Sequence, residues 1–117
     1  MNKKELKKQY LQNLPAMGIF KVENSVSKKL FVDFGLNVKG KINGCKFQLD
    51  NNSHPNKGLQ EDYNTFGGNN FIFEVIDILE PKDNESKNYV EELKILEEMW
   101  IEKLKSYNEF GYNKRKC

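Results

Sequence analysis

The chain contains few cysteines, histidines and arginines. Its 117 residues include one histidine, His54, one arginine, Arg115, and two cysteines, Cys45 and Cys117. Two cysteines without metal-site spacing are too few for a disulfide framework or a zinc module, and we expect two reduced thiols. A single histidine without a second is weak evidence for a metal ligand.

Long hydrophobic runs are also missing. The longest apolar runs are only a few residues, as at residues 18–20 and 71–73, whereas a helix that crosses a bilayer needs about 20. Residues 1–5 are not followed by an apolar block, which argues against a signal peptide and predicts a cytoplasmic protein with no membrane partner. With 38% hydrophobic and 31% charged residues, we expect one soluble globular domain.

Charge is distributed unevenly along the chain. Residues 1–60 carry 11 lysines against four acidic residues, a net charge of +7. Residues 61–117 carry seven lysines, one arginine and 13 acidic residues, a net charge of −5, so the whole chain is at +2. A basic first half can face the phosphates of a nucleic acid. The alternative is a solvated, lysine-rich surface, and the sequence does not choose between the two.

Hydrophobic periodicity divides the chain into elements. It predicts a helix over 3–13, a hairpin of strands at 17–24 and 29–34, a helix over 55–65, a strand at 71–79 and a helix over 87–105. Ser53 is the expected N-cap of the 55–65 helix, with Pro55 in its first turn. The nearly continuous apolar sequence of 71–79 predicts a central strand.

Residues 36–50 are ambiguous. Leu36 and Phe47 are candidates for one helix face, but Gly40 and Gly44 would each cost about 1 kcal/mol relative to alanine inside a helix. Taken together, the elements predict an α+β domain in which helices cover a small three-stranded antiparallel sheet.

Several short motifs follow this order of elements. Gly-Ile-Phe stands at residues 18–20, Phe-Val-Asp at 31–33, Glu97 lies three positions before Trp100, and Gly-Tyr-Asn stands at 111–113. These motifs, together with His54, resemble the GIY-YIG nuclease superfamily over residues 17–113. The remaining parts are an N-terminal helical extension (1–16) and a basic tail (114–117). Residues 43–62 are most similar to the LuxR-like branch, a label that suggests transcription regulation.

The resemblance implies specific roles for residues. Such nucleases cut phosphodiester bonds with one divalent cation, usually Mg²⁺, which implies that Glu97 is the metal ligand. Phe20 and Phe31 stand at the positions of two family tyrosines, and Lys41 stands where an arginine binds the scissile phosphate. Cys45 stands at the position of a family histidine. Asp33 also replaces the glycine of the second strand motif.

The chemistry at these positions has changed. Phenylalanine cannot exchange a proton, and losing a general base typically lowers a rate by ~10²–10⁴-fold. Lysine lacks the bidentate fork of arginine, and a neutral thiol does not replace an imidazole. The resemblance therefore implies an impaired or inactive nuclease-like module that binds nucleic acid or regulates. Two alternatives stay open: an active Mg²⁺-dependent DNA endonuclease and a protein–protein module in transcription regulation.

Candidate contacts to nucleic acid include charged and polar residues: Lys41, Lys46, His54, Lys57 and Asn113. Each candidate has a purely structural interpretation as well. The two phenylalanines can simply pack the sheet, Glu97 can lie on the polar face of its helix, and His54 can be a loop residue. No cofactor beyond a divalent metal ion is implied.

Overall fold

The computed structural model describes residues 15–81 and 89–114. The helix predicted over 3–13, Arg115 and Cys117 therefore lie outside the described residues. The elements follow the predicted order: β1 (Met17–Asn24), β2 (Leu30–Gly35), α2 (Val38–Asp50), α3 (Lys57–Phe66), the short 3₁₀ helix η1 (Gly68–Asn70), β3 (Phe71–Leu79), α4 (Tyr89–Leu104) and the 3₁₀ helix η2 (Asn108–Phe110). Among the described residues, none of the helices has the length and apolar character needed to traverse a membrane.

The sheet has three antiparallel strands in the order β2-β1-β3. The α+β fold class is confirmed, but the prediction that β3 is central is wrong, because β1 occupies the middle. Two side chains of β3, Ile72 and Ile78, are 50% and 43% exposed. The apolar run of β3 arises because the strand contributes Phe73 to the core on one face and Ile76 and Leu79 to the core on the other.

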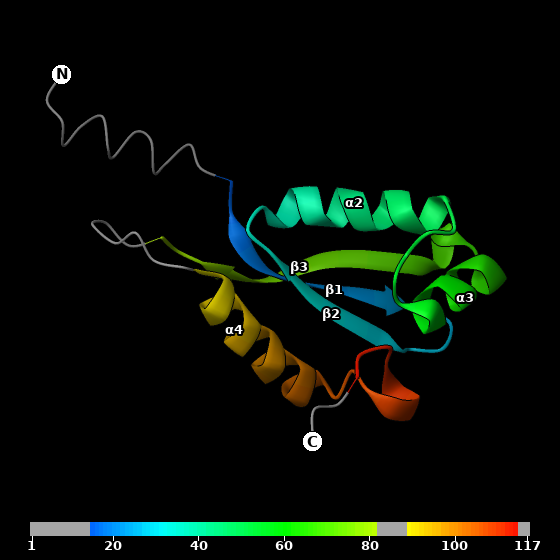
Figure 1. Ribbon diagram of the computed structural model, residues 1–117. Coiled ribbons are helices and arrows are strands. Elements are labelled where there is room, and N and C mark those ends of the chain that lie inside the picture. The colour runs from blue at the N-terminus through cyan, green and yellow to red at the C-terminus, as the bar shows by residue number, and fades with distance from the viewer. Residues whose placement is uncertain (1–14, 82–88, 115–117) are drawn as a thin grey trace, which may run out of the picture.

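Each face of the sheet has its own core. On one face, Phe20 and Val22 of β1 pack with Leu49 of α2 and Leu59 of α3. On the opposite face, Ile19 of β1 packs with residues of β2 and α4. Figure 1 shows α2 and α3 on one side of the sheet and α4 on the other. The sequence predicted that helices cover the sheet, and the structure shows that they cover both of its faces.

The pairing of β1 with β3 contains an irregularity near the start of β1. The register shifts between Ile19 and Phe20. A side chain at Gly18 would overlap the carbonyl oxygen of Asp77 on β3. Position 18 therefore requires glycine for this close approach of the two backbones.

The ambiguous segment 36–50 forms helix α2. The Asn37 side chain caps its start by accepting a hydrogen bond from the backbone N–H of Gly40 at 3.1 Å. Val38, Cys45 and Leu49 form the buried face of the helix. The expected face was wrong, because its two apolar members are exposed: Leu36 is 52% exposed and Phe47 is 68% exposed.

Helix α3 begins later than predicted. Asn56 is its N-cap, and the Asn56 side chain accepts a hydrogen bond from the backbone N–H of Leu59 at 3.0 Å. The predicted cap, Ser53, instead donates its backbone N–H to the Gln48 carbonyl of α2 at 2.8 Å. Pro55 consequently precedes the helix and belongs to the loop between α2 and α3.

The outer edge of β2 is covered by the segment that follows α4. The Tyr112 backbone N–H donates to the Leu30 carbonyl at 2.9 Å. The Asn113 side chain forms two bonds with the backbone of Val32, accepting from its N–H and donating to its carbonyl, both at 2.8 Å. Ser106 also donates its hydroxyl to the Asn113 side-chain oxygen at 2.8 Å. Residues 111–113 are thereby fixed against β2.

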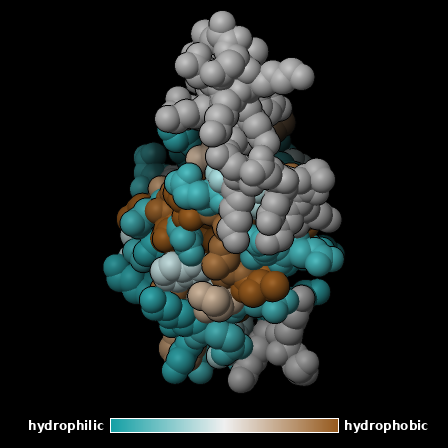
Figure 2. All heavy atoms as spheres, turned by 90° about the vertical axis from the view of Figure 1, so that its left-hand side faces the viewer, coloured by the Kyte–Doolittle hydropathy of each residue, from teal (hydrophilic) through white to brown (hydrophobic). Residues whose placement is uncertain are grey.

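One end of the molecule carries exposed apolar side chains. Figure 2 views the end at which β1 and α2 begin and β3 ends, and hydrophobic side chains gather in the middle of this face. Leu36, just before α2, and Ile78, near the end of β3, are exposed large hydrophobic residues of these segments.

Candidate functional site

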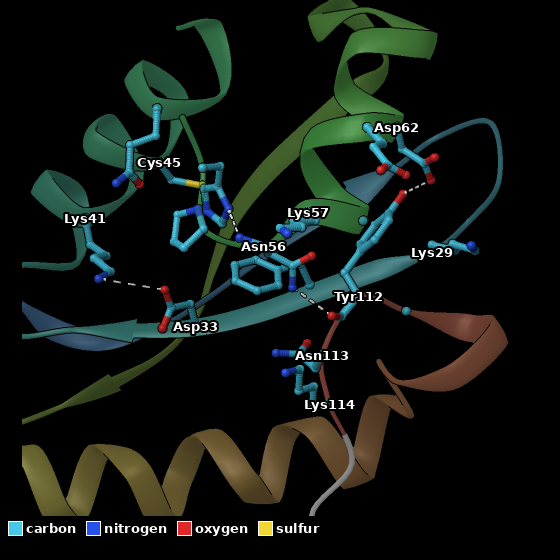
Figure 3. A pocket seen from close by; sticks show the side chains of 17 residues that line it. Lys29, Asp33, Lys41, Cys45, Asn56, Lys57, Asp62, Tyr112, Asn113 and Lys114 are labelled. Carbon is cyan, nitrogen blue, oxygen red and sulfur yellow. Dashed lines mark hydrogen bonds and ion pairs between the residues drawn. The ribbon is translucent and has the colours of Figure 1, made fainter. Parts of the chain in front are cut away.

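A pocket of about 930 Å³ lies between β2, α2, the start of α3 and the segment that follows α4. Figure 3 shows side chains from these elements converging on it. The structure brings together most of the residues singled out from the sequence: Phe31, Asp33, Lys41, Cys45, His54, Lys57 and Asn113 line this pocket.

Three of the singled-out residues lie elsewhere. Phe20 is completely buried in the core that α2 and α3 cover. The Lys46 ammonium lies 5.0 Å from the centre of the Phe73 ring, and Lys46 does not line the pocket. Glu97 lines an adjoining depression of about 570 Å³. The depression and the pocket share Asp33, so the two cavities are neighbours.

The Lys41 ammonium at the pocket wall faces a carboxylate. Its Nζ lies 3.9 Å from Oδ2 of Asp33, and Figure 3 shows the pair bridging α2 and β2. Burial raises the pKa of Asp33, while a hydrogen bond from the Phe34 backbone and the charge of Lys41 act in the opposite direction. Asp33 therefore offsets part of the positive charge at the position where the resemblance places a phosphate-binding arginine.

The Cys45 thiol is buried and neutral. Burial, with a smaller contribution from the Asp33 charge, raises its pKa to about 11, against the opposing effect of Lys41. At pH 7 almost all of this side chain is therefore in the thiol form. Cys45 supplies neither a negative charge nor a strong hydrogen-bond acceptor to the pocket.

The His54 imidazole is also neutral, and its tautomer is set by the backbone. Its Nδ1 accepts a hydrogen bond from the Asn56 N–H at 3.0 Å. Burial lowers the pKa of His54, although Asp33 and the Asn56 bond raise it. A ring nitrogen that accepts a hydrogen bond is unprotonated, so the proton resides on Nε2. In this state Nε2 can donate a hydrogen bond but cannot take up a proton.

A network that the sequence analysis missed fixes one wall of the pocket. The Asn56 side chain donates to the Tyr112 carbonyl at 2.8 Å, which ties the start of α3 to the final segment. The Tyr112 hydroxyl donates to Asp62 at 2.7 Å and accepts from Asn24 at 3.2 Å. Burial and the bond to Asp62 raise the pKa of Tyr112 to about 12. The Gly-Tyr-Asn motif signalled this position without indicating its partners.

The role of Asn113 is visible in the same wall. Its side-chain oxygen accepts two hydrogen bonds and its amide nitrogen donates one, all within the fold. The residue lines the pocket, but its polar atoms hold the wall against β2. Asn113 is thus a positioning residue for the pocket in this structure.

The residues around Glu97 limit which metal ion this part of the chain can hold. Among residues 15–81 and 89–114, there is no group of three or more His, Cys, Asp or Glu side chains placed to hold a metal ion. Glu97 lines its depression together with Glu98 and Glu102. Mg²⁺ commonly keeps several waters and binds through one or two carboxylates. A single carboxylate such as Glu97 would therefore suit a largely hydrated Mg²⁺ ion, whereas the described residues offer no closed zinc site.

This combination of sheet, helices and pocket defines a GIY-YIG endonuclease fold. No protein-family model matches the chain, and no curated protein matches it. Among solved structures, the chain is similar to the catalytic domain of the homing endonuclease I-TevI, with a TM-score of 0.66, 25% identity, and coverage of 86% of this chain and 99% of that one. It is also similar to a mutant of the catalytic domain of the intron endonuclease I-TevI, with a TM-score of 0.69, 19% identity, and coverage of 84% and 92%. The likeness at 25% identity supports the GIY-YIG superfamily, and the likeness at 19% identity supports the fold.

Proposed function

We propose that this chain is a nucleic-acid-binding module built on a GIY-YIG endonuclease fold, with phosphodiester cleavage strongly impaired or lost. One observation supports the proposal: the pocket residues at the positions of the family's reactive groups are neutral or lie beside an opposite charge. Phe31 has no ionisable group, Cys45 and His54 are neutral, and Lys41 lies beside Asp33.

The impairment follows from proton chemistry. A general base must accept a proton from the attacking water in the transition state, which contributes ~10²–10⁴-fold to the rate. His54 carries its proton on the nitrogen that is not bound to Asn56, and the Tyr112 hydroxyl donates to Asp62. Glu97 would hold a Mg²⁺ ion, which supplies Lewis-acid stabilisation of a phosphate when bound. Phe31, which stands at the position of a family tyrosine and lines the pocket, has no hydroxyl group and cannot take that role.

Binding is favoured by the lysines around the pocket. Four lysines from different segments line it: Lys29, Lys41, Lys57 and Lys114. Asp33, Glu61 and Asp62 line the same pocket. Because Lys41 is paired with Asp33, we count the other three lysines as available to displace counterions from phosphates. A protein that neutralises three phosphates of duplex DNA has a slope of about −2.7 in log affinity against log salt concentration.

The binding part of the proposal is tested by fluorescence anisotropy with a labelled DNA duplex over a range of KCl concentrations. We expect a slope near −3, and Lys57→Gln should make it shallower by about 0.9. The matched control is Lys103→Gln, because Lys103 lies against Trp100 on α4 and lines neither cavity. A salt-independent interaction, or no interaction with either duplex or single-stranded DNA, would overturn nucleic-acid binding and leave the protein–protein module.

The catalytic part is tested on the same preparation with Mg²⁺ and Mn²⁺ titrations against plasmid and oligonucleotide DNA. We expect no cleavage above background. Metal-dependent cleavage that disappears in Glu97→Ala would show that the chain is an active endonuclease and would overturn the impairment. Cleavage that persists in Glu97→Ala would point to contamination, or would overturn Glu97 as the metal ligand implied by the resemblance.

A further inference from the structure

The exposed aromatic ring of Phe47 lies next to the pocket. Phe47 is 68% exposed, the highest value among the exposed large hydrophobic residues of the described chain. It lines a groove of about 500 Å³ on the surface of α2. Three residues, Lys41, Cys45 and Gln48, line both this groove and the pocket. An extended ligand that leaves the pocket over α2 therefore meets Phe47.

The charges of α2 indicate what kind of ligand fits this groove. The helix carries three exposed lysines and one acidic residue. Lys41 lines the groove beside Asp33, and Lys46 lies against the Phe73 ring. The acidic residue, Asp50, accepts a hydrogen bond from the Tyr63 hydroxyl. An exposed aromatic ring on a basic helix, beside a lysine-lined pocket, is the combination that binds single-stranded nucleic acids, with bases stacked on the ring and phosphates near the cations.

The backbone beside Phe47 is also open to close approach. At Gly44, which lines the same groove, an added side-chain carbon would have no atom within 4 Å. The surface at Gly44 is therefore not covered by another part of the described fold within that distance. A sugar or base lying there would contact the helix backbone directly.

From these observations we infer that Phe47 stacks an unpaired base of the nucleic-acid strand that occupies the pocket. The ligand class is consequently single-stranded or locally unpaired nucleic acid, since the faces of bases inside a duplex are already stacked. The inference rests on the proposed nucleic-acid binding and adds to it the strand form that is recognised.

The test compares a labelled single-stranded oligonucleotide with a hairpin duplex of the same sequence by fluorescence anisotropy at fixed KCl. Phe47→Ala should weaken single-strand binding by roughly 5- to 150-fold, the range for loss of one stacked base. It should change duplex binding by less than about 2-fold and leave the single-strand salt slope unchanged, because no charge is lost. Phe47→Trp should retain the affinity, and Phe47→Leu should lose it although the side chain stays apolar.

Phe110→Ala is the matched control, since Phe110 is 59% exposed in η2 and lines neither the groove nor the pocket. It should leave the single-strand affinity unchanged. If the unaltered protein binds neither strand form, the proposed function and this inference both fail. If it binds single strands and Phe47→Ala binds them equally well, this inference alone fails. An equal loss for duplex and single strand, or a change in oligomeric state without a change in affinity, also overturns the role of Phe47.

Discussion

The two glycines inside α2 allow helix propensity to be separated from steric effects. Gly44 is the seventh residue of the 13-residue helix Val38–Asp50, and its position is exposed. A methyl group added there meets no atom within 4 Å. Replacing an interior helix glycine by alanine stabilises by about 0.8–1.0 kcal/mol. Gly44→Ala should therefore raise the free energy of unfolding by about 1 kcal/mol.

Gly40 has the same low helix propensity as Gly44, but its surroundings differ. An added methyl carbon would lie 2.9 Å from Nδ2 and 3.4 Å from Oδ1 of Asn37, the side chain that caps the helix. Asn37 must then move away from its hydrogen bond with the Gly40 backbone, and losing an N-cap costs about 1 kcal/mol. The two effects oppose each other, so Gly40→Ala should leave the free energy of unfolding nearly unchanged.

Urea unfolding followed by the fluorescence of Trp100 measures both variants. Trp100 is the single tryptophan and donates its indole N–H to Asp77 on β3 at 2.9 Å, so its signal reports the packing of α4 on the sheet. With a slope of about 1–3 kcal/mol per molar urea, Gly44→Ala should raise the midpoint by about 0.3–1 M at an unchanged slope. A neutral Gly44→Ala, or equal stabilisation by Gly40→Ala, would refute the reasoning.

Three further predictions concern the pocket. Asp33→Asn should raise nucleic-acid affinity severalfold in an anisotropy titration because the carboxylate beside Lys41 is removed; unchanged affinity would mean that the pair is not limiting. Asn113→Ala should lower the free energy of unfolding by about 2–4 kcal/mol in urea, because the backbone N–H and carbonyl of Val32 lose their partners. In a Cys117→Ser background, the rate at which Cys45 reacts with a disulfide reagent should rise about tenfold for each pH unit, because the thiolate is the reactive form. The rise should continue until the pH approaches the Cys45 pKa of about 11. A plateau near pH 9 would contradict that value.

Most elements could be predicted because their apolar periods are strong. The strand at Met17–Asn24 and the helix stripe that includes Leu93 follow directly from spacing. Helix α2 was ambiguous because its apolar residues are sparse and glycines interrupt them, and the Asn37 cap decides its start. The position of β3 was predicted wrongly. A nearly continuous apolar run is expected for a central strand, but it also arises in an edge strand when helices pack on both of its faces.

The site was predicted in part for a similar reason. Phe31, Lys41 and Cys45 match positions of the family motifs, and the resemblance therefore implied that they lie together. In the structure all three line one pocket. The pairing of Lys41 with Asp33 depends on how α2 lies against β2, which no local pattern specifies. The bond between Tyr112 and Asp62 joins residues 50 positions apart and depends on the whole fold. Residue types were thus predictable, whereas their partners and protonation were not.

The segment that covers β2 also has a consequence for synthesis on the ribosome. Translation proceeds from the N-terminus, so β1 and β2 leave the ribosome about 80 residues before Asn113, whose side chain bonds to Val32. Until then the outer edge of β2 presents unpaired backbone groups, the feature through which nascent chains associate wrongly with one another. Completing the fold and shielding this vulnerable edge therefore occur in the same late event.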